Sequence, residues 1–253
     1  MIPKIIHYAW FGSEVPIEVK QRVASWHQIL PDWEIKFWNA DNWDVNLYDF
    51  SKEMAQKGAW AYVVDPLRFD VLYRYGGVYL DVDTVIHQNL DEFLTEKVVL
   101  GFLYNNSAGS SPIFSEPGHP FVEKVLQVYR DDTLHDLHEK LYLMTNNPVI
   151  TMILKEQYPN FKLNDSMQEL ASGVKIFPKG WFAYRYPNDQ ADVNYTEHLF
   201  MNSWGTANLG LRGLVKRMVK RFAPTLWINI STARGAEESE RLGLTIDVTE
   251  EIE

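Results

Sequence analysis

Residues 59–86 read AWAYVVDPLRFDVLYRYGGVYLDVDTVI and contain the two elements on which the fold depends. Residues 59–75 predict a helix. A helical wheel that turns about 100° per residue gathers its apolar residues on one face, namely Trp60, Val64, Leu67, Val71 and Tyr75. The Gly76-Gly77 pair can end this helix, because glycine adopts the left-handed backbone conformation at little cost. Residues 78–86 then predict a strand.

Two carboxylates, Asp81 and Asp83, stand toward the end of this predicted strand. Because side chains alternate along a strand, both are expected to point to the same side. Like charges so close repel each other unless a cation lies between them or one is protonated. Their hard oxygen atoms favour Mg²⁺ or Mn²⁺, ions that complete their shell with water and substrate phosphates. A D-x-D pair is also common where a strand runs out into solvent. The surrounding sequence therefore has to distinguish a metal site from an exposed strand end.

The helix before this strand carries two charged pairs with different predicted roles. Asp65 and Arg68 are three residues apart, and Arg68 borders the apolar face, where a charge is costly unless it is paired or holds a ligand. A helix-anchoring salt bridge and a ligand site both explain this pair. Asp70 and Arg74 lie across from the apolar face, and their spacing predicts a solvated surface ion pair.

Helices and strands alternate along most of the chain. Strand-like runs occupy residues 2–10, 33–38, 98–103 and 174–177, and helical runs occupy 17–30, 46–57, 119–130 and 148–158. This alternation predicts an α/β fold with a mainly parallel, Rossmann-like sheet and flanking helices. Such sheets bind ligands beyond the carboxyl ends of their strands.

Composition excludes several classes of protein. The net charge of −10 argues against nucleic-acid binding, which requires a basic surface. The absence of cysteine excludes disulfides and thiolate metal sites. The N-terminus lacks the apolar stretch of a signal peptide, and no segment approaches the roughly 20 apolar residues of a membrane span. We expect a cytoplasmic protein, at most attached to the inner face of the membrane.

The composition changes near residue 206, which predicts a domain over residues 1–205 and an appendage over 206–253. Residues 211–222 contain five basic residues and no acidic one, whereas residues 237–253 form a mostly acidic tail. The apolar and basic residues of 211–222 fall on opposite faces of a helical wheel. This pattern fits a helix lying in an anionic membrane surface, and equally an amphipathic helix packed on its own domain.

The central stretch resembles a known family. Residues 64–70 (VDPLRFD) and 73–83 (YRYGGVYLDVD) resemble the D-x-D sugar-binding region of glycosyltransferase family 32, and are similar to the catalytic domain of the large clostridial glucosylating toxins. Residues 2–12 (IPKIIHYAWFG) resemble the opening strand of this family. Residues 146–148 and 198–204 show weaker similarity, so the resemblance spans residues 2–205.

The resemblance implies a GT-A fold and the transfer of a hexose, with retention of anomeric configuration, from a nucleotide-sugar donor. UDP-hexoses and GDP-mannose are the donors expected, and a glycan or a lipid-linked molecule is the acceptor. Bacterial relatives imply a role in polysaccharide biosynthesis. The family also implies a divalent cofactor, Mn²⁺ or Mg²⁺, which would stabilise the charge of the leaving diphosphate as a Lewis acid.

The resemblance also implies roles for single residues. The metal would be held by Asp83, Asp81 and His198, although this chain has Leu199 where many relatives have a second histidine. Catalysis would rest on Asp81, Asp83 and Trp204, whose indole N–H would reach the departing oxygen. The donor would be bound by Trp10, Asp65, Arg68, Tyr79, Asp81 and Ser203, with Trp10 against the nucleobase.

Other readings of these residues remain open. Trp10 also fits simple core packing, because most of nine tryptophans must be structural. A carboxylate pair holding Ca²⁺ would suit a non-enzymatic carbohydrate-binding module. A sugar nucleotidyltransferase would use a similar fold and a metal, but it usually carries a glycine-rich basic loop near its N-terminus, which this chain lacks.

Overall fold

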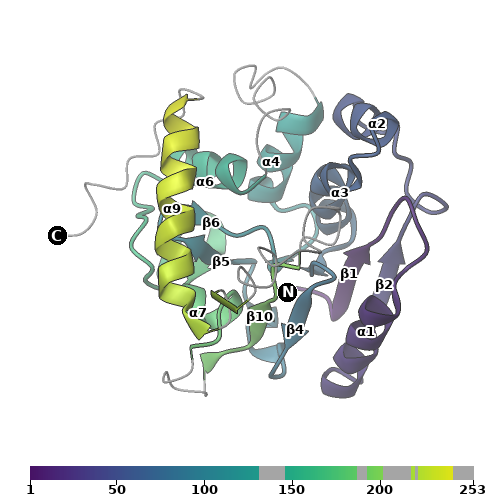
Figure 1. Cartoon of the computed structure of the whole chain (residues 1–253), viewed down its shortest axis with the longest axis horizontal. Coiled ribbons are helices and arrows are strands. Elements are labelled where there is room, and N and C mark those ends of the chain that lie inside the picture. The colour runs from purple at the N-terminus through teal and green to yellow at the C-terminus, as the bar shows by residue number, and fades with distance from the viewer. Residues whose placement is uncertain (131–145, 187–192, 202–217, 220–221, 242–253) are drawn as a thin grey trace.

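A computed structural model of the chain describes residues 1–130, 146–186, 193–201, 218–219 and 222–241. The described residues form a twisted central sheet with helices on both faces (Figure 1). The side chains of β5 (Val98–Tyr104) show why there are two cores. Val98 and Leu100 enter the apolar cluster on one face, whereas Val99 enters the cluster on the other. A strand that is apolar on both sides fits a sheet that is covered on both sides.

The central sheet mixes strand directions but is mainly parallel. Its order is β2 (Glu34–Trp38), β1 (Ile5–Ala9), β3 (Gly77–Tyr79), β7 (Ile113–Ser115), β5, β9 (Val174–Phe177) and β8 (Gln168–Leu170), with β6 (Ser107–Ala108) paired to β5. β2, β1, β3, β5 and β9 run in one direction, and β7, β8 and β6 run in the other. The predicted α/β class with a mainly parallel sheet is confirmed.

Among the described residues, five helices follow the predicted ranges closely, whereas the helices over residues 179–182 and 224–241 were not predicted. The helices are α1 (Ile17–Ile29), α2 (Asp49–Gln56), α3 (Trp60–Tyr75), α4 (Pro120–Arg130), α6 (Asn146–Gln157), α7 (Lys179–Phe182) and α9 (Pro224–Arg241). Two short 3₁₀ turns occupy Asp91–Thr95 and Ala171–Gly173. No helix of the described residues has both the length and the apolar character needed to cross a membrane.

Helix α3 is buried on every side over residues 63–72, which corrects one prediction. Asp70, predicted to be solvated, is buried and accepts hydrogen bonds from Trp43 Nε1 at 2.8 Å and from the Tyr48 hydroxyl at 3.2 Å. It also pairs with Arg74, which reaches solvent. The helical wheel identified one buried face, but Trp43 and Tyr48, which come just before α2, cover Asp70 on another face, and α2 and α4 also pack on α3.

The prediction of one strand over residues 78–86 is wrong. β3 ends at Tyr79, the chain turns, and a separate strand β4 (Thr84–Ile86) pairs antiparallel with β10 (Thr196–His198). The amide of Thr84 donates to the carbonyl oxygen of Asp81 at 2.9 Å and closes the turn. Asp81 and Asp83 therefore lie in a turn between strands, and their common direction comes from this turn.

Glycine is required where α3 passes into β3. Gly76 and Gly77 have φ values of 64° and 101°, as the predicted positive-φ helix end requires. The ψ of −165° at Gly76 differs from that of a left-handed cap. A Cβ atom on Gly77 would lie 2.5 Å from the backbone oxygen of Ile5. The two strands approach each other closely only because this position has no side chain.

Part of the predicted appendage packs on the rest of the protein. Helix α9 lies along the outside of the sheet near β5 (Figure 1). Ile228 is buried with Leu103 and Tyr184, and the amide of Asn105 donates to the Thr232 hydroxyl at 3.2 Å. Most of the predicted amphipathic helix over 211–222, and the acidic tail beyond residue 241, lie outside the described residues.

Candidate active site

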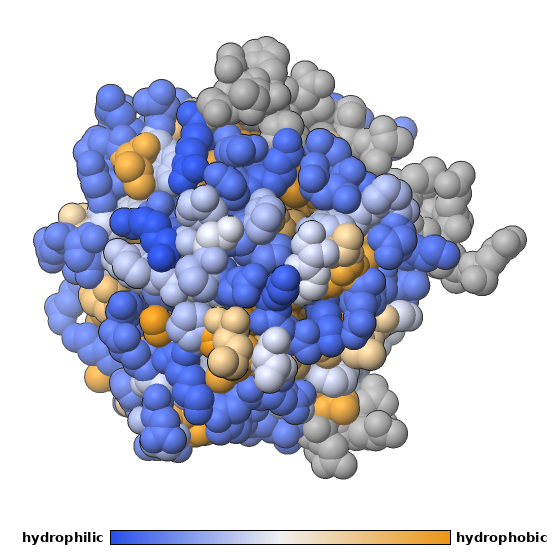
Figure 2. Space-filling view, turned by 180° about the vertical axis from the view of Figure 1, so that it is seen from behind, coloured by the Kyte–Doolittle hydropathy of each residue, from blue (hydrophilic) through white to orange (hydrophobic). Residues whose placement is uncertain are grey.

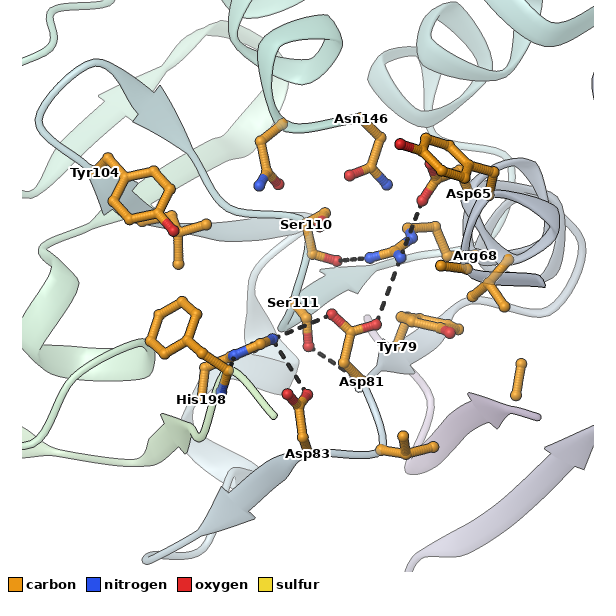
Figure 3. Close-up of a pocket in the computed structure, with 18 residues that line it drawn as sticks. Asp65, Arg68, Tyr79, Asp81, Asp83, Tyr104, Ser110, Ser111, Asn146 and His198 are labelled. Atoms are coloured by element: carbon orange, nitrogen blue, oxygen red, sulfur yellow. Dashed lines mark hydrogen bonds and ion pairs between the residues drawn. The ribbon is translucent and has the colours of Figure 1, made fainter. Parts of the chain in front are cut away.

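A cavity of about 320 Å³ opens where the strands β1, β3 and β5 end. Ala9, Tyr79 and Tyr104 line it, each at the carboxyl end of one of these strands. Helix α3 forms one wall with Asp65 and Arg68 (Figure 3). The cavity therefore lies at the edge of the sheet where the alternating pattern predicts a ligand site.

Asp81, Asp83 and His198 meet at the floor of this cavity (Figure 3). His198 Nε2 lies 3.4 Å from Asp81 Oδ2 and 3.3 Å from Asp83 Oδ1. One ligand atom from each residue lies within 4.8 Å of the others. Two carboxylates and one imidazole so arranged fit Mn²⁺ or Mg²⁺ in their donor atoms, and the open side leaves room for ligands from a substrate.

Residues 198–201 wrap around Asp83 through their backbone. The amide of Leu199 donates to the Asp83 carbonyl oxygen at 2.9 Å, and the amide of Met201 donates to Asp83 Oδ2 at 2.8 Å. Between them Phe200 adopts a φ of 51°, a strained value for a bulky residue. One oxygen of the Asp83 carboxylate is thus held by the backbone, which fixes the direction of the other.

The backbone of this segment also controls the imidazole of His198. The amide of Phe200 donates to His198 Nδ1 at 3.1 Å. A neutral imidazole that accepts at Nδ1 carries its proton on Nε2, the atom that faces Asp81 and Asp83. In this tautomer Nε2 is a hydrogen-bond donor to the carboxylates. Metal binding through Nε2 requires this proton to leave, so a ligand role for His198 is coupled to a tautomer change.

Arg68 links the other groups of the cavity. Its Nη2 lies 3.3 Å from Asp65 Oδ1 and 3.4 Å from Asp81 Oδ1, and its Nη1 donates to the Ser110 carbonyl oxygen at 2.7 Å. The guanidinium also lies 4.9 Å from the centre of the Tyr79 ring. The predicted Asp65–Arg68 pair therefore forms, and it is directed into the cavity.

The two carboxylates beside Arg68 titrate differently. Burial raises the pKa of Asp65 to about 7, against the opposing effect of the Arg68 charge. Burial acts in the same direction on Asp81, but the Arg68 charge and the hydrogen bond from His198 outweigh it and hold the Asp81 pKa below its usual range. Burial also raises the pKa of the Tyr79 phenol. Asp81 is thus the anion of the pair, and Asp65 is the group that takes up a proton more readily.

Several cavity residues were missed by the sequence analysis. Ser111 Oγ accepts a hydrogen bond from the Asp81 amide at 2.8 Å, and the Ser110 carbonyl oxygen accepts one from Arg68. Asn146 starts α6, is 4% exposed, and its Nδ2 has no hydrogen-bond partner although it lines the cavity (Figure 3). Residues 146–148 carried a weak family signal, whereas residues 110–111 carried none. A buried amide without a partner is costly, which points to a ligand that would satisfy it.

The remaining predicted residues do not line the described cavity. Trp10 is buried with Val19 and Val82, and its Nε1 donates to the Ser13 carbonyl oxygen at 3.1 Å. Its predicted contact with a nucleobase stays a prediction. Ser203 and Trp204 lie outside the described residues.

Residues 16–100 match the family model described as "Glycosyltransferase sugar-binding region containing DXD motif". This part of the chain is a DXD glycosyltransferase region. The predicted resemblance to the DXD glycosyltransferases is thereby confirmed. The match ends before Ser110, Asn146 and His198, so these cavity residues come from sequence outside the matched region.

Several curated proteins similar to this chain are named as glycosyltransferases or as enzymes of mannosylated lipids. "Inositol phosphoceramide mannosyltransferase 2" of Schizosaccharomyces pombe is 29% identical over 169 residues, covering 62% of this chain and 47% of the relative. "Mannosyl phosphorylinositol ceramide synthase SUR1" of Saccharomyces cerevisiae is 24% identical over 172 residues, covering 64% and 44%. "Uncharacterized glycosyltransferase L373" of Acanthamoeba polyphaga mimivirus is 30% identical over 148 residues, covering 50% and 55%. The chain spans about half the length of these relatives.

One solved structure is similar to part of the chain. The "PaToxG Glycosyltransferase" superposes with a TM-score of 0.45 at 16% identity, covering 62% of this chain and 70% of the other.

Proposed function

We propose that the chain is a retaining hexosyltransferase of GT-A type that uses a nucleotide-sugar donor and a divalent ion. The observation that carries the proposal is the position of Asp81. Its carboxylate lies 3.4 Å from Arg68 and 3.4 Å from His198, so one anion joins the α3 wall to the floor of the cavity. A non-enzymatic sugar-binding module needs no such connection between the residues that hold a sugar and the residues that hold an ion.

The wall formed by α3 and α6 suits the donor sugar. Asp65 and the planar fork of Arg68 present an acceptor and donors for hydroxyl groups, and Asn146 adds an amide nitrogen that has no hydrogen-bond partner among the described residues. Tyr79 packs beneath the guanidinium and limits its movement. Holding the sugar through several such bonds orients its anomeric carbon, and orientation is a large part of the catalytic effect in transfer reactions.

The floor of the cavity suits the diphosphate. Asp81 and Asp83 would hold Mn²⁺ or Mg²⁺, which when bound would act as a Lewis acid on the leaving phosphate. His198, through its Nε2 proton, is placed to donate to an anionic oxygen at the same point. The Met201 amide keeps Asp83 turned toward the cavity.

Retention is proposed through attack on the same face as the leaving group. Among the described residues, the acidic side chains that line the cavity are Asp65, Asp81 and Asp83. Each of these is already engaged by Arg68 or His198, which makes a free carboxylate nucleophile a poor fit. The leaving phosphate would then help to deprotonate the acceptor hydroxyl.

The names of the relatives guide the choice of donor and acceptor. Mannosyltransferases acting on inositol phosphoceramide favour GDP-mannose over UDP-hexoses as the donor, and an inositol-containing glycolipid over a free glycan as the acceptor. The aromatic end of the cavity, where Tyr104 and Phe200 lie, is the side left for an acceptor ring. A role in polysaccharide assembly is the second candidate, and it follows from the family resemblance alone.

A donor panel tests the proposed function. Purified protein with Mn²⁺ is incubated with GDP-mannose, UDP-glucose, UDP-galactose and UDP-N-acetylglucosamine, and release of the nucleoside diphosphate is measured. We expect one donor to be hydrolysed, with the activity lost on chelation and in Asp83→Asn. Sugar binding without nucleotide binding would instead identify a carbohydrate-binding module. Pyrophosphate release from a nucleoside triphosphate and a sugar phosphate would identify a nucleotidyltransferase.

A further inference from the structure

Helix α1 supports the turn that carries Asp81 and Asp83, although none of its side chains lines the described cavity. Arg22 Nη1 donates to the carbonyl oxygen of Val82, the middle residue of the D-x-D motif, at 2.7 Å. This carbonyl belongs to the planar peptide group that joins Val82 to Asp83. A bond to it fixes the plane of that peptide, and therefore the position from which the Asp83 side chain starts.

The same guanidinium also contacts the segment that holds the Asp83 carboxylate. Arg22 Nη2 lies 3.2 Å from Met201 Sδ. The Met201 amide in turn donates to Asp83 Oδ2 at 2.8 Å. Because sulfur is a weak acceptor, this second contact is weaker than the bond to the Val82 carbonyl. Arg22 thus contacts both the residue before Asp83 and the residue whose amide holds the Asp83 carboxylate.

Two further contacts fix α1 against this turn. Trp26 is fully buried, and its Nε1 donates to the Thr84 carbonyl oxygen at 2.9 Å. The side chain of Val82 packs with Val19, which also belongs to α1, in a small apolar cluster. Val82 and Thr84, on either side of Asp83, are therefore both bonded to one helix, and this helix cannot shift without moving the turn.

Arg22 differs from the charged residues of the open surface. Hydrophilic residues cover most of the face of the molecule shown in Figure 2, and replacing a surface side chain usually changes stability little. Lys20, also on α1, is a surface residue, because its side chain is 51% exposed and pairs with Glu14, which is 90% exposed. Arg22 is half-buried and bonded to the backbone of the motif. The two residues therefore separate the effect of a positive charge on α1 from the effect of the bond to Val82.

We propose that Arg22 is a positioning residue that sets the direction of the Asp83 carboxylate for a divalent ion. This inference rests on the proposed function, because it needs an ion at Asp83. Arg22 acts through the Val82 carbonyl and through Met201, and it lies outside the cavity lining. Without it the peptide before Asp83 would be free to tilt, and ion binding would have to order that peptide. Groups that orient a metal ligand typically contribute about ten- to a hundredfold to metal affinity.

Mn²⁺ binding without any donor sugar tests this proposal. The electron paramagnetic resonance signal of free Mn²⁺ is recorded while Mn²⁺ is titrated into the full chain, alone and with GDP or UDP. The test variants are Arg22→Met, which keeps an apolar stem without hydrogen-bond donors, and Arg22→Gln, a polar replacement that suits a half-exposed position. Lys20→Met is the matched control, because it removes the same charge from the same helix. Melting temperatures show that each variant is folded.

We expect both Arg22 variants to bind Mn²⁺ about tenfold more weakly than the wild type, and Lys20→Met to bind it as tightly as the wild type. A folded Arg22 variant with wild-type affinity overturns the proposal. An equal loss of affinity in Lys20→Met also overturns it, because the effect would then come from charge alone. In both outcomes the wild type still binds Mn²⁺, so the proposed ion site stands. A wild type that binds no Mn²⁺ would overturn the ion site and this proposal together.

Discussion

Arg68 donates from Nη1 to the carbonyl oxygen of Ser110 at 2.7 Å, across 42 positions of sequence. This bond ties helix α3 to the loop between β6 and β7. The second nitrogen of the same fork lies between Asp65 and Asp81. One buried guanidinium thus sets the positions of a backbone loop, a helical carboxylate and the first aspartate of the D-x-D motif.

Arg68→Lys should lower kcat/KM by about ten- to a hundredfold, because an ammonium cannot replace a planar fork that reaches three groups at once. The melting temperature should also fall, since the Ser110 bond is lost. Kinetics are measured well below the melting point, so that unfolding does not contribute. Arg74→Lys is the matched control, because Arg74 pairs with Asp70 outside the cavity. Normal kinetics in Arg68→Lys would show that Arg68 is a structural strut only.

Asp83→Asn should abolish activity while the fold is kept. The amide oxygen can still accept the Met201 N–H, so residues 198–201 should keep their conformation. The negative charge that would hold a divalent ion is lost. Loss of Lewis-acid stabilisation worth several kcal/mol corresponds to a rate loss of about a hundredfold or more. Donor hydrolysis is followed across a Mn²⁺ titration. A variant that responds to Mn²⁺ like the wild type would rule out Asp83 as a ligand.

Asn146→Ala should reduce donor turnover about tenfold without lowering the melting temperature, because its buried Nδ2 bonds no other residue that the structure describes. Asn194 is the contrasting case. Its Nδ2 donates to the carbonyl oxygens of Gly180, Tyr184 and Thr196 at 2.9 to 3.1 Å, so Asn194→Ala should lower the melting temperature clearly. If Asn146→Ala destabilises the protein as strongly and leaves kcat/KM intact, the amide has a structural role.

Stability should depend on pH through His7. Its Nε2 lies 2.8 Å from the Gly76 carbonyl oxygen, Trp38 Nε1 donates to its Nδ1 at 3.1 Å, and burial lowers its pKa from 6.5 to about 4. The unfolded chain then binds more protons than the folded one between these values. The stability from neutral His7 is present above pH 6.5 and is lost as pH falls toward 4, by an amount on the order of 3 kcal/mol.

Urea unfolding at pH 7 and at pH 4.5 measures this loss. His7→Gln keeps a donor for the Gly76 carbonyl but cannot titrate, so its free energy of unfolding should fall less over the same range. Equal pH dependence in the wild type and the variant would contradict a buried, neutral His7.

Most elements of the sheet and its helices could be predicted because their apolar periodicity is strong. The failures have local physical causes. Residues 78–86 alternate like one strand, but the Thr84 amide bonds to the Asp81 carbonyl and closes a turn, which periodicity cannot report. The helical wheel predicted an exposed Asp70 because it considers one helix alone, whereas Trp43 and Tyr48 from the segment before α2 cover this carboxylate.

The candidate site was predictable only where its residues are close in sequence. Asp65, Arg68, Asp81 and Asp83 fall within one motif, and the structure brings them to one cavity. Ser110 and Asn146 arrive from distant segments and carry polar groups of a kind found in any loop. The role of Phe200 is less visible still, because it consists of an amide bonded to His198 and a φ of 51°, backbone geometry that no side-chain pattern encodes.

The backbone wrap around Asp83 has a consequence for biosynthesis. In the part of the chain that the structure describes, the strands of the central sheet are complete by Phe177, whereas the residues that hold Asp83 and His198 come afterwards, at positions 198–201. On a ribosome the sheet can therefore assemble before the cavity has its floor. A nascent chain at that stage would have its sheet but would lack the backbone bonds that hold Asp83 and His198 in place.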